Sequence, residues 1–240
     1  MKLIRFLAIF FFDMLDKFIH QKKIILFFKK KKIKINFFVD VGAHKGSYTD
    51  LILKNFKTKK IFMFEPQKKI FEIIIKKYKK ITNVKAYNYA ISNKNNFQKI
   101  YINRHDLTSS LTKLNESNSY LKKKSKLFIE NSKQSLIKET YNVKTVRLSD
   151  FLNKSSIKKI ELLKIDTEGH ELEVLLGLGK RIKDTQYVLI EFHRDKIYYN
   201  YKPKKIHNYL VKNNFKLEDT FRFPFTYWED RVYVNKFFSN

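Results

Sequence analysis

The chain has 240 residues, enough for one substantial hydrophobic core, so we expect a single folded domain with short additions. It contains no cysteine, which excludes a disulfide framework, a thiolate zinc site and a cysteine nucleophile, and predicts a reducing, cytoplasmic location. The net charge of +28 makes RNA or an anionic membrane a candidate partner, although Lys, Asn, Ile and Phe share A/T-rich codons that offer a genomic explanation.

Residues 1–35 form an apolar and basic segment without turn signals. Its apolar run at 7–12 is interrupted by Asp13 and Asp16, well short of the roughly 20 residues that a transmembrane helix needs. Lysines at 29–32 follow, and no small-residue cleavage site is present. Two interpretations stay open: a helix packed on the following domain, or an interfacial helix whose lysines contact anionic head groups at the inner membrane face.

From residue 36 the pattern alternates short β-rich runs with longer helical ones, which predicts a doubly wound α/β sheet in a domain spanning 36–240. The chain ends in a predicted antiparallel hairpin around Pro224, so the sheet is expected to be mostly parallel. Residues 93–145 are polar and fit hairpins or a mobile insertion. Pro66 and Ser149 are predicted at helix starts. We predict strands at 37–41, 61–64, 84–91, 160–165 and 187–192, and helices at 47–56, 67–78, 171–182 and 203–214.

The stretch DVGAHKG at 40–46 joins the first predicted strand to the first helix. Gly42 allows a tight turn off the strand, and Gly46 allows the backbone to pass close to a ligand at the helix start. Glu65 ends the second strand, where a carboxylate is placed to hold two ribose hydroxyls. Strand, glycine turn, helix and second-strand carboxylate together predict a nucleotide site.

The nucleotide is not expected to be NAD, because the fingerprint G-x-G-x-x-G is not met. His44 and Ser47 stand at its second and third glycine positions. Asp40 would also bring a carboxylate next to a diphosphate. The same carboxylate suits S-adenosylmethionine, which has an α-amino group, a sulfonium and a ribose but no phosphate.

A series of short motifs then follows in a characteristic order: DVGAHKGSYT, FEP at 64–66, NYAIS at 88–92, TSSL at 108–111, VRLSDFL at 146–152, LLKIDTEGHELEVLLGLG at 162–179 and VLIEFH at 188–193. Over roughly residues 36–195 the chain resembles FkbM-type S-adenosylmethionine-dependent methyltransferases. The KIDTEGHELEVLLG segment is the most specific part, and His44 departs from the Asn that is frequent in this loop. The resemblance implies a class I methyltransferase, or Rossmann-like, fold.

The resemblance also implies a cofactor site built from the ends of the first three strands. Asp40 could instead cap the next helix, and Ile91 could be ordinary core. The implied cofactor-binding residues are Asp40 facing the methionine amine, the backbone of Gly42, Ala43, His44 and Gly46 along the methionine, Glu65 on the ribose, and Ala90 and Ile91 beside the adenine.

Asp166 and Glu168 follow the fourth strand, on the crevice side where open α/β sheets bind ligands, and are the predicted catalytic residues. His193 is the predicted base that removes an acceptor hydroxyl proton, although a structural hydrogen-bonding role is the alternative. His170 is a weaker candidate for the same role. Asp166, Glu191 and His193 could instead hold a divalent cation, but their spacing does not establish it, so no metal site is predicted.

The resemblance implies methylation of a hydroxyl, and a sugar in a cell-surface glycan or glycolipid is the preferred acceptor. The methyl acceptor could also be a small molecule, and nucleic acid is not expected as a partner. A basic RNA-binding methyltransferase or RNA-binding module is the alternative, and a catalytically dead scaffold is another.

Overall fold

The computed structural model describes residues 11–12, 14–104, 109–119, 121–122, 135–155, 157–194, 196–224 and 226–238. Residues 1–10, Asp13 and the first position of the TSSL motif, Thr108, lie outside the described residues.

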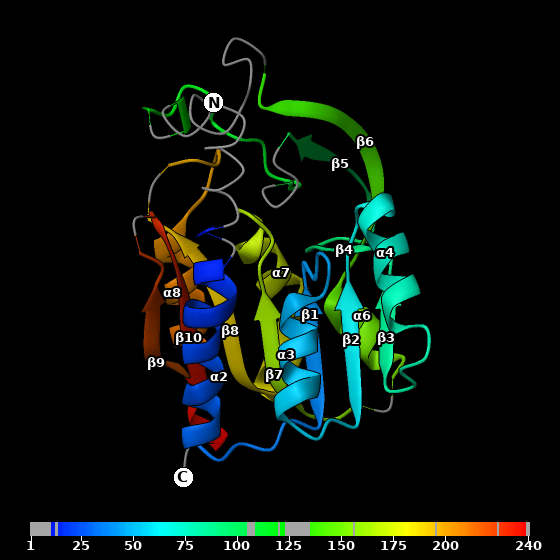
Figure 1. The fold of residues 1–240 in the computed structure, drawn as a ribbon. Helices are drawn as coiled ribbons and strands as arrows, with labels where there is room; N and C mark the ends of the chain where they lie inside the picture. The colour runs from blue at the N-terminus through cyan, green and yellow to red at the C-terminus, as the bar shows by residue number, and fades with distance from the viewer. Residues whose placement is uncertain are drawn as a thin grey trace.

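A seven-stranded sheet forms the centre of the molecule, with strand order β3-β2-β1-β7-β8-β10-β9 (Figure 1). The first five strands in this order are parallel, and β10 and β9 are antiparallel additions at one edge. The predicted sheet, mostly parallel with an antiparallel C-terminal hairpin, is therefore confirmed. The strands are β1 (Phe37–Val41), β2 (Lys60–Phe64), β3 (Val84–Tyr87), β7 (Ile160–Ile165), β8 (Thr185–His193), β9 (Phe215–Arg222) and β10 (Trp228–Asn235).

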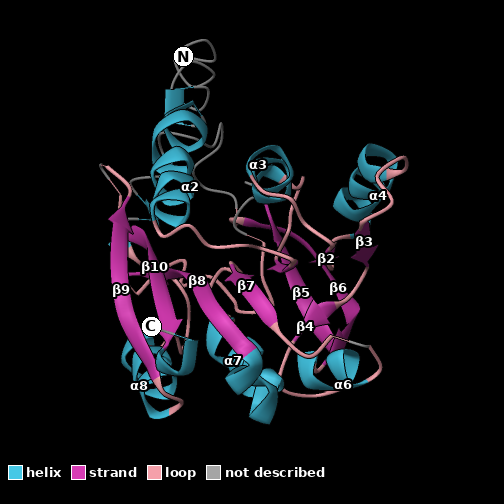
Figure 2. Cartoon of the chain, turned by 90° about the horizontal axis from the view of Figure 1, so that it is seen from below, coloured by secondary structure: helices cyan, strands magenta, loops and turns pink. Residues whose placement is uncertain are grey.

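Helices cover both faces of this sheet (Figure 2). Alternating strand side chains feed two hydrophobic clusters, with Val39 and Val41 in one and Phe38 in the other. One face carries α2 (Gln21–Lys30), α3 (Ser47–Asn55) and α4 (Lys68–Tyr78), and the other carries α6 (Leu148–Asn153), α7 (Glu171–Leu178) and α8 (Pro203–Lys212). Shorter turns of helix lie at η1 (Asp16–His20), η3 (Gly179–Asp184) and η4 (Lys236–Phe238).

The amphipathic helix α2 packs its apolar side on the sheet, as the first interpretation of residues 1–35 predicted. Ile24, Ile25 and Phe28 are buried in the cluster shared with α3 and α4. His20, just before α2, contacts Asp230 of β10 through Nε2 and Oδ2 at 2.8 Å. The described helices include none that is both long and apolar enough to cross a bilayer.

The predicted strand at 84–91 is wrong as a single element, because it divides between two sheets. β3 stays in the main sheet, whereas β4 (Ala90–Ile91) joins a second sheet with order β4-β6-β5. Asn88 lies at the break, and its side-chain amide donates to the backbone oxygens of Glu65 and Pro66, which ties the break to the end of β2. β5 (Asn96–Asn103) and β6 (Ile137–Val146) are antiparallel, so the described part of 93–145 contains the expected hairpin pairing.

Three predicted helix boundaries also differ. Ser149 is the second residue of α6 and not its cap, because Leu148 begins the helix and is fully buried. Pro66 precedes the cap residue of α4, Gln67. The helix predicted at 171–182 is shorter in the structure, where α7 ends at Leu178. Gly179 has φ +54°, and the chain continues as the 3₁₀ turn η3.

The order of strands reverses between β1 and β7. The chain runs outward from β1 through β2 to β3 on one side, and from β7 to β8 on the other. In open parallel sheets a ligand crevice forms outside the carboxyl ends of the strands at such a reversal. The predicted site residues at the ends of β1, β2, β7 and β8 therefore meet at one edge.

Candidate active site

The turn between β1 and α3 is a left-handed backbone segment pressed against the end of β7. Gly42, His44 and Gly46 have φ values of +78°, +44° and +80°. A side chain at Gly42 would overlap the backbone oxygen of Asp166, so only glycine fits between the two strand ends. The backbone N–H groups of Gly42 and Ala43 both donate to the Phe64 oxygen, at 3.0 and 3.1 Å, which fixes the turn against β2.

Glu65, at the end of β2, is buried and holds this turn through hydrogen bonds to its backbone. Its Oε2 accepts from the backbone N–H of His44 at 2.9 Å, and its Oε1 accepts from that of Gln67 at 2.8 Å. Burial raises the pKa of Glu65 to about 6, against the opposing effect of these N–H groups. An ionised carboxylate has about four acceptor positions, so both oxygens keep capacity for further donors.

Asp40, on β1, is fully buried and linked to the end of β7 through a buried lysine. Thr49 Oγ1 donates to Asp40 Oδ2 at 2.9 Å, while Lys164 Nζ lies 3.8 Å from Asp40 Oδ1 and 2.9 Å from Asp166 Oδ2. Burial raises the pKa of Asp40, and Lys164 opposes that shift. Burial acts to lower the pKa of Lys164, but the carboxylates of Asp166 and Asp40 outweigh it and the pKa is raised.

The remaining predicted cofactor residues, Ala90 and Ile91, are buried in β4 and pair with Thr145 and Val146 of β6. Ser92 follows them, and its Oγ lies 2.9 Å from Nε2 of His170. Burial lowers the pKa of His170 to about 4, so the imidazole is neutral at neutral pH.

The loop after β7 presents Glu168 in a conformation that non-glycine residues rarely adopt. Glu168 has φ +56° and Gly169 has φ +93°. The buried carboxylate of Glu171 holds the loop, since its Oε1 accepts from the backbone N–H of Thr167 at 3.2 Å and of Gly169 at 2.9 Å. Strained residues held by surrounding hydrogen bonds occur preferentially at ligand sites.

Glu168, Glu191 and His193 form a compact cluster at the ends of β7 and β8. One oxygen or nitrogen from each lies within 4.8 Å of the others. His193 Nε2 is 3.2 Å from Glu191 Oε2 and 3.5 Å from Glu168 Oε2, and the Tyr198 hydroxyl donates to Glu168. Burial raises the pKa of Glu168, and the nearby Glu191 carboxylate raises it further. Burial also raises the pKa of Glu191, with a second contribution from the Asp166 carboxylate.

The structure therefore brings the predicted catalytic residues to one edge but divides them between two sets of contacts. Asp166 pairs with Lys164, while Glu168 and His193 face Glu191. In the alternative cation set considered from the sequence, Glu168 takes the place of Asp166. His170 contacts Ser92 and is not a member of the cluster.

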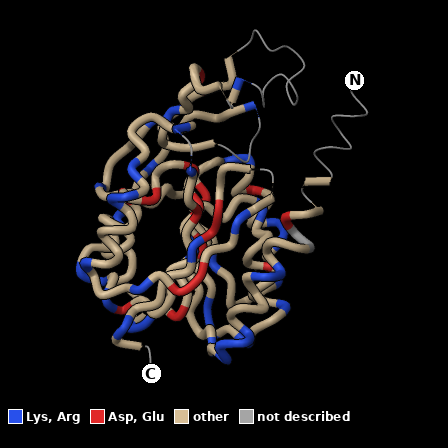
Figure 3. Tube along the Cα trace, turned by 90° about the vertical axis from the view of Figure 1, so that its left-hand side faces the viewer, with Lys and Arg blue, Asp and Glu red and all other residues tan. Residues whose placement is uncertain are grey.

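Acidic groups gather at the centre of a basic protein. Figure 3 shows Asp and Glu concentrated along the central strands, while Lys and Arg are spread over the outer elements. Buried acids at or near the site include Asp40, Glu65, Glu171, Glu191 and Asp230. The interior of this edge therefore favours cationic ligands, although the whole chain carries +28.

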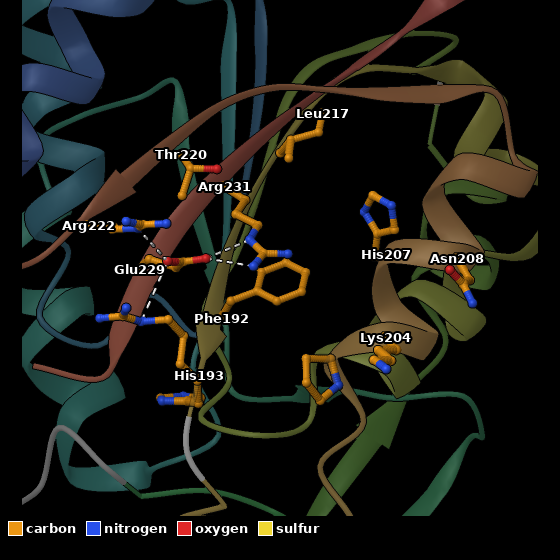
Figure 4. Close-up of a pocket in the computed structure, with 12 residues that line it drawn as sticks. Phe192, His193, Lys204, His207, Asn208, Leu217, Thr220, Arg222, Glu229 and Arg231 are labelled. Carbon is orange, nitrogen blue, oxygen red and sulfur yellow. Dashed lines mark hydrogen bonds and ion pairs between the residues drawn. The ribbon is translucent and has the colours of Figure 1, made fainter.

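A cavity of about 600 Å³ lies on the α8 face of the sheet, and its lining includes Arg194, Lys204, Arg222 and Arg231 (Figure 4). Glu229 lies 2.7 Å from Arg231, 3.4 Å from Arg222 and 3.7 Å from Arg194. His193 borders this cavity, but its ring points away from Arg231 and Glu229. The cavity and the cluster therefore adjoin at His193.

Sequence reasoning missed Lys164, Glu171 and Tyr198. Lys164 carried a signal, since it is the one charged residue near the end of the run LLKI, and a lysine in a buried strand needs a carboxylate partner. Glu171 stands three residues after Glu168 at the helix start, where carboxylates accept backbone N–H groups. Tyr198 carried no signal, because only the folded chain brings it to Glu168.

Comparison with known proteins identifies the family to which the chain belongs. The family model described as "Methyltransferase FkbM domain" matches residues 40–217. Hexuronic acid methyltransferase AglP of Haloferax volcanii is 33% identical over 51 residues, which are 21% of this chain and 21% of that protein.

Solved structures agree on the fold. Methyltransferase FkbM from Methylobacillus flagellatus KT is 14% identical with a TM-score of 0.53, covering 84% of this chain and 43% of that one. TrmK of M. capricolum in complex with S-adenosyl-homocysteine is 10% identical with a TM-score of 0.50, covering 91% and 68%. The chain spans less than half of the Methylobacillus protein, and identities this low show the fold alone, which is that of the class I methyltransferases. Because the family model covers well over half of the sequence, the chain belongs to the FkbM methyltransferase family.

Proposed function

We propose that this protein transfers a methyl group from S-adenosylmethionine to a hydroxyl of a sugar in a cell-surface glycan or glycolipid. The observation that carries the proposal is the shared edge of the sheet: carboxylates beside a glycine turn at the ends of β1 and β2, and a histidine with two carboxylates at the ends of β7 and β8. Membership of the FkbM family supports it.

The residues at the ends of β1 and β2 fit S-adenosylmethionine. Asp40 Oδ1 is buried and has no hydrogen-bond partner among the described residues, which suits a cationic amine. Glu65 keeps acceptor capacity for ribose hydroxyls beyond its two N–H donors. The backbone of 42–46 is proposed to line the methionine portion, and Ala90 and Ile91 to border the adenine. When bound, the cofactor supplies an electrophilic methyl group on a sulfonium.

Asp166, Glu168 and His193 are proposed to act on the acceptor. An acceptor hydroxyl must be aligned with the methyl group and must lose its proton. Asp166 is held by Lys164 and Glu168 by Tyr198, so both carboxylates are oriented before an acceptor binds. His193 Nε2 is a candidate to take the proton, since histidine is the side chain that most often acts as a general base.

A sugar acceptor is supported by the similarity to hexuronic acid methyltransferase AglP over 51 residues. The test has two steps. Calorimetry with S-adenosylhomocysteine should show binding, and NADH should not bind. Extracted glycans and lipids from cells with and without the protein should then differ by the mass of a methyl group. A protein that binds RNA with strong salt dependence and ignores S-adenosylhomocysteine would favour the RNA-binding alternative.

Peripheral contact of residues 1–35 with an anionic membrane is also proposed, as a means of concentrating a lipid-linked acceptor. Ile24, Ile25 and Phe28 are used in the core, which leaves Phe11, Leu26 and the lysines of α2 on the outside.

Flotation with anionic vesicles at low salt tests the membrane contact. The double change Phe11→Ser and Leu26→Ser should reduce flotation. Phe97→Ser is the matched control, because Phe97 is 71% exposed but lies on β5. Equal flotation of all three proteins, or none of the wild type, contradicts the membrane contact.

A further inference from the structure

The cluster of Glu168, Glu191 and His193 has the composition of a cation site. Two carboxylates and one imidazole present atoms within 4.8 Å of one another at the ends of neighbouring strands. Carboxylate oxygens and imidazole nitrogens both occur as ligands of divalent metal ions in proteins. Acidic groups often lie together without an ion, so this grouping is not sufficient by itself.

A second observation points to a ligand. His193 is 4% exposed and Glu191 is 8% exposed, yet His193 Nε2 and Glu191 Oε2 have no hydrogen-bond partner among the described residues. These atoms lie 3.2 Å apart and face each other. Buried polar atoms nearly always make a hydrogen bond, and a buried polar atom without one destabilises the fold. Two such atoms facing each other therefore indicate a ligand that contacts both.

We infer that Glu168, Glu191 and His193 bind one divalent transition-metal cation, with Mn²⁺ preferred to Mg²⁺. The imidazole favours a transition-metal ion over Mg²⁺, which takes oxygen ligands, and the two carboxylates suit Mn²⁺ among the transition metals. The Tyr198 hydroxyl, which donates to Glu168, orients that carboxylate as an outer partner of the site. Lys164 is occupied by Asp166 and Asp40, so its positive charge is directed to those carboxylates.

The three protein ligands leave positions open in an octahedral ion, and this defines an acceptor class. An acceptor with two neighbouring oxygen atoms, a diol or a hydroxy-carboxylate such as that of a uronic acid, can occupy two of them. This part rests on the proposed methyl transfer. His193 Nε2 cannot hold a cation and a proton at once, so in this arrangement Asp166 takes the proton of the acceptor hydroxyl.

Mn²⁺ binding by the full-length protein, followed by electron paramagnetic resonance without cofactor, tests the site. About one ion per chain is expected. Glu191→Gln and His193→Gln should weaken the dissociation constant at least tenfold, and Tyr198→Phe should weaken it by roughly 10- to 100-fold. Glu173→Gln on α7 and His207→Gln on α8 are matched controls outside the cluster and should bind like wild type.

The outcomes separate the site from the proposed function. The cation site is overturned if wild type does not bind Mn²⁺, or if Glu191→Gln and Tyr198→Phe both bind it with wild-type affinity. Tyr198→Phe is chosen because it removes the hydroxyl but keeps the ring that packs on Gly169. Enhanced water-proton relaxation by the bound Mn²⁺ is expected from open positions, and its absence overturns the acceptor class. Calorimetry with S-adenosylhomocysteine in EDTA reports on the cofactor half independently, so a failure there contradicts only the methyl-transfer proposal.

Discussion

The two halves of the site differ in how their carboxylates are satisfied. In the first half, at the ends of β1 and β2, Glu65 accepts two backbone N–H groups, and Asp40 accepts from the Thr49 hydroxyl through Oδ2 while its Oδ1 makes no hydrogen bond among the described residues. In the second half, at the ends of β7 and β8, His193 Nε2 and Glu191 Oε2 lie 3.2 Å apart and make no hydrogen bond among the described residues. Backbone N–H groups therefore fix Glu65 in the first half, whereas the second half holds two facing groups that no backbone N–H satisfies.

Lys164 and Gly42 join the halves. Lys164 lies between Asp40 and Asp166 and contacts a carboxylate of each half. Gly42 brings the β1 turn into contact with the Asp166 backbone. A variant that acts on one half alone would show that the division is real, and a variant at the join should disturb both.

The largest effect is expected from Asp166→Asn and Glu168→Gln. Each should lower turnover by roughly 10²-fold or more, because proton transfer and acceptor alignment contribute about 10²- to 10⁴-fold to such reactions. S-adenosylhomocysteine affinity should stay within a few-fold of wild type, since neither residue belongs to the first half. Rates come from a methyl-transfer assay with an identified acceptor, and Glu173→Gln is the control. Wild-type turnover in both variants would misplace the catalytic residues.

Gly42→Ala should destabilise the fold by roughly 3 kcal/mol or more, because a left-handed φ costs about 1–3 kcal/mol and the new methyl group overlaps backbone. Gly46→Ala has a similar φ, but the new methyl group would meet the Tyr78 side chain and not backbone, so a smaller loss is expected. Urea unfolding of both variants measures the difference. Equal losses of stability would show that the contact between the two halves is not tight.

How far the sequence predicted this molecule depends on the range of the interactions. The strand at 37–41 and the turn at 40–46 follow from local periodicity and glycine chemistry, and the structure confirms those elements. The break between β3 and β4 was missed, because it depends on Asn88 reaching Glu65 and Pro66. Pairing Asp166 with Lys164, and Glu168 with Tyr198, likewise depends on contacts that only the tertiary fold creates.

Glu65→Ala should weaken S-adenosylhomocysteine binding by ~1.5–3 kcal/mol, or about 10- to 150-fold, because it removes charge-assisted hydrogen bonds to the ribose. Calorimetry measures the affinity, and thermal unfolding checks that the turn held by Glu65 stays folded. Glu72→Ala, an exposed carboxylate on α4, is the control. Unchanged affinity would remove Glu65 from the cofactor half.

The smallest effect is a pH dependence of the same contact. Burial raises the pKa of Glu65 to about 6, from an ordinary value of 4.5. Because the folded pKa is the higher one, protonation of Glu65 favours the folded state: this contribution to stability is complete below pH 4.5 and is lost as the pH rises through 6. Cofactor binding has the opposite sign, since the ribose hydroxyls donate to the ionised carboxylate.

S-adenosylhomocysteine affinity should therefore fall about tenfold between pH 7 and pH 5, as protonation of Glu65 removes the binding-competent form. Asp16, whose pKa burial also raises to about 6, titrates over the same range, and it lies in η1 beside His20 and Gln21. Glu65→Gln separates the two, because it keeps an acceptor oxygen and cannot ionise. If the affinity of Glu65→Gln falls with pH as steeply as that of wild type, another group controls the titration and the first half of the site is not held by Glu65.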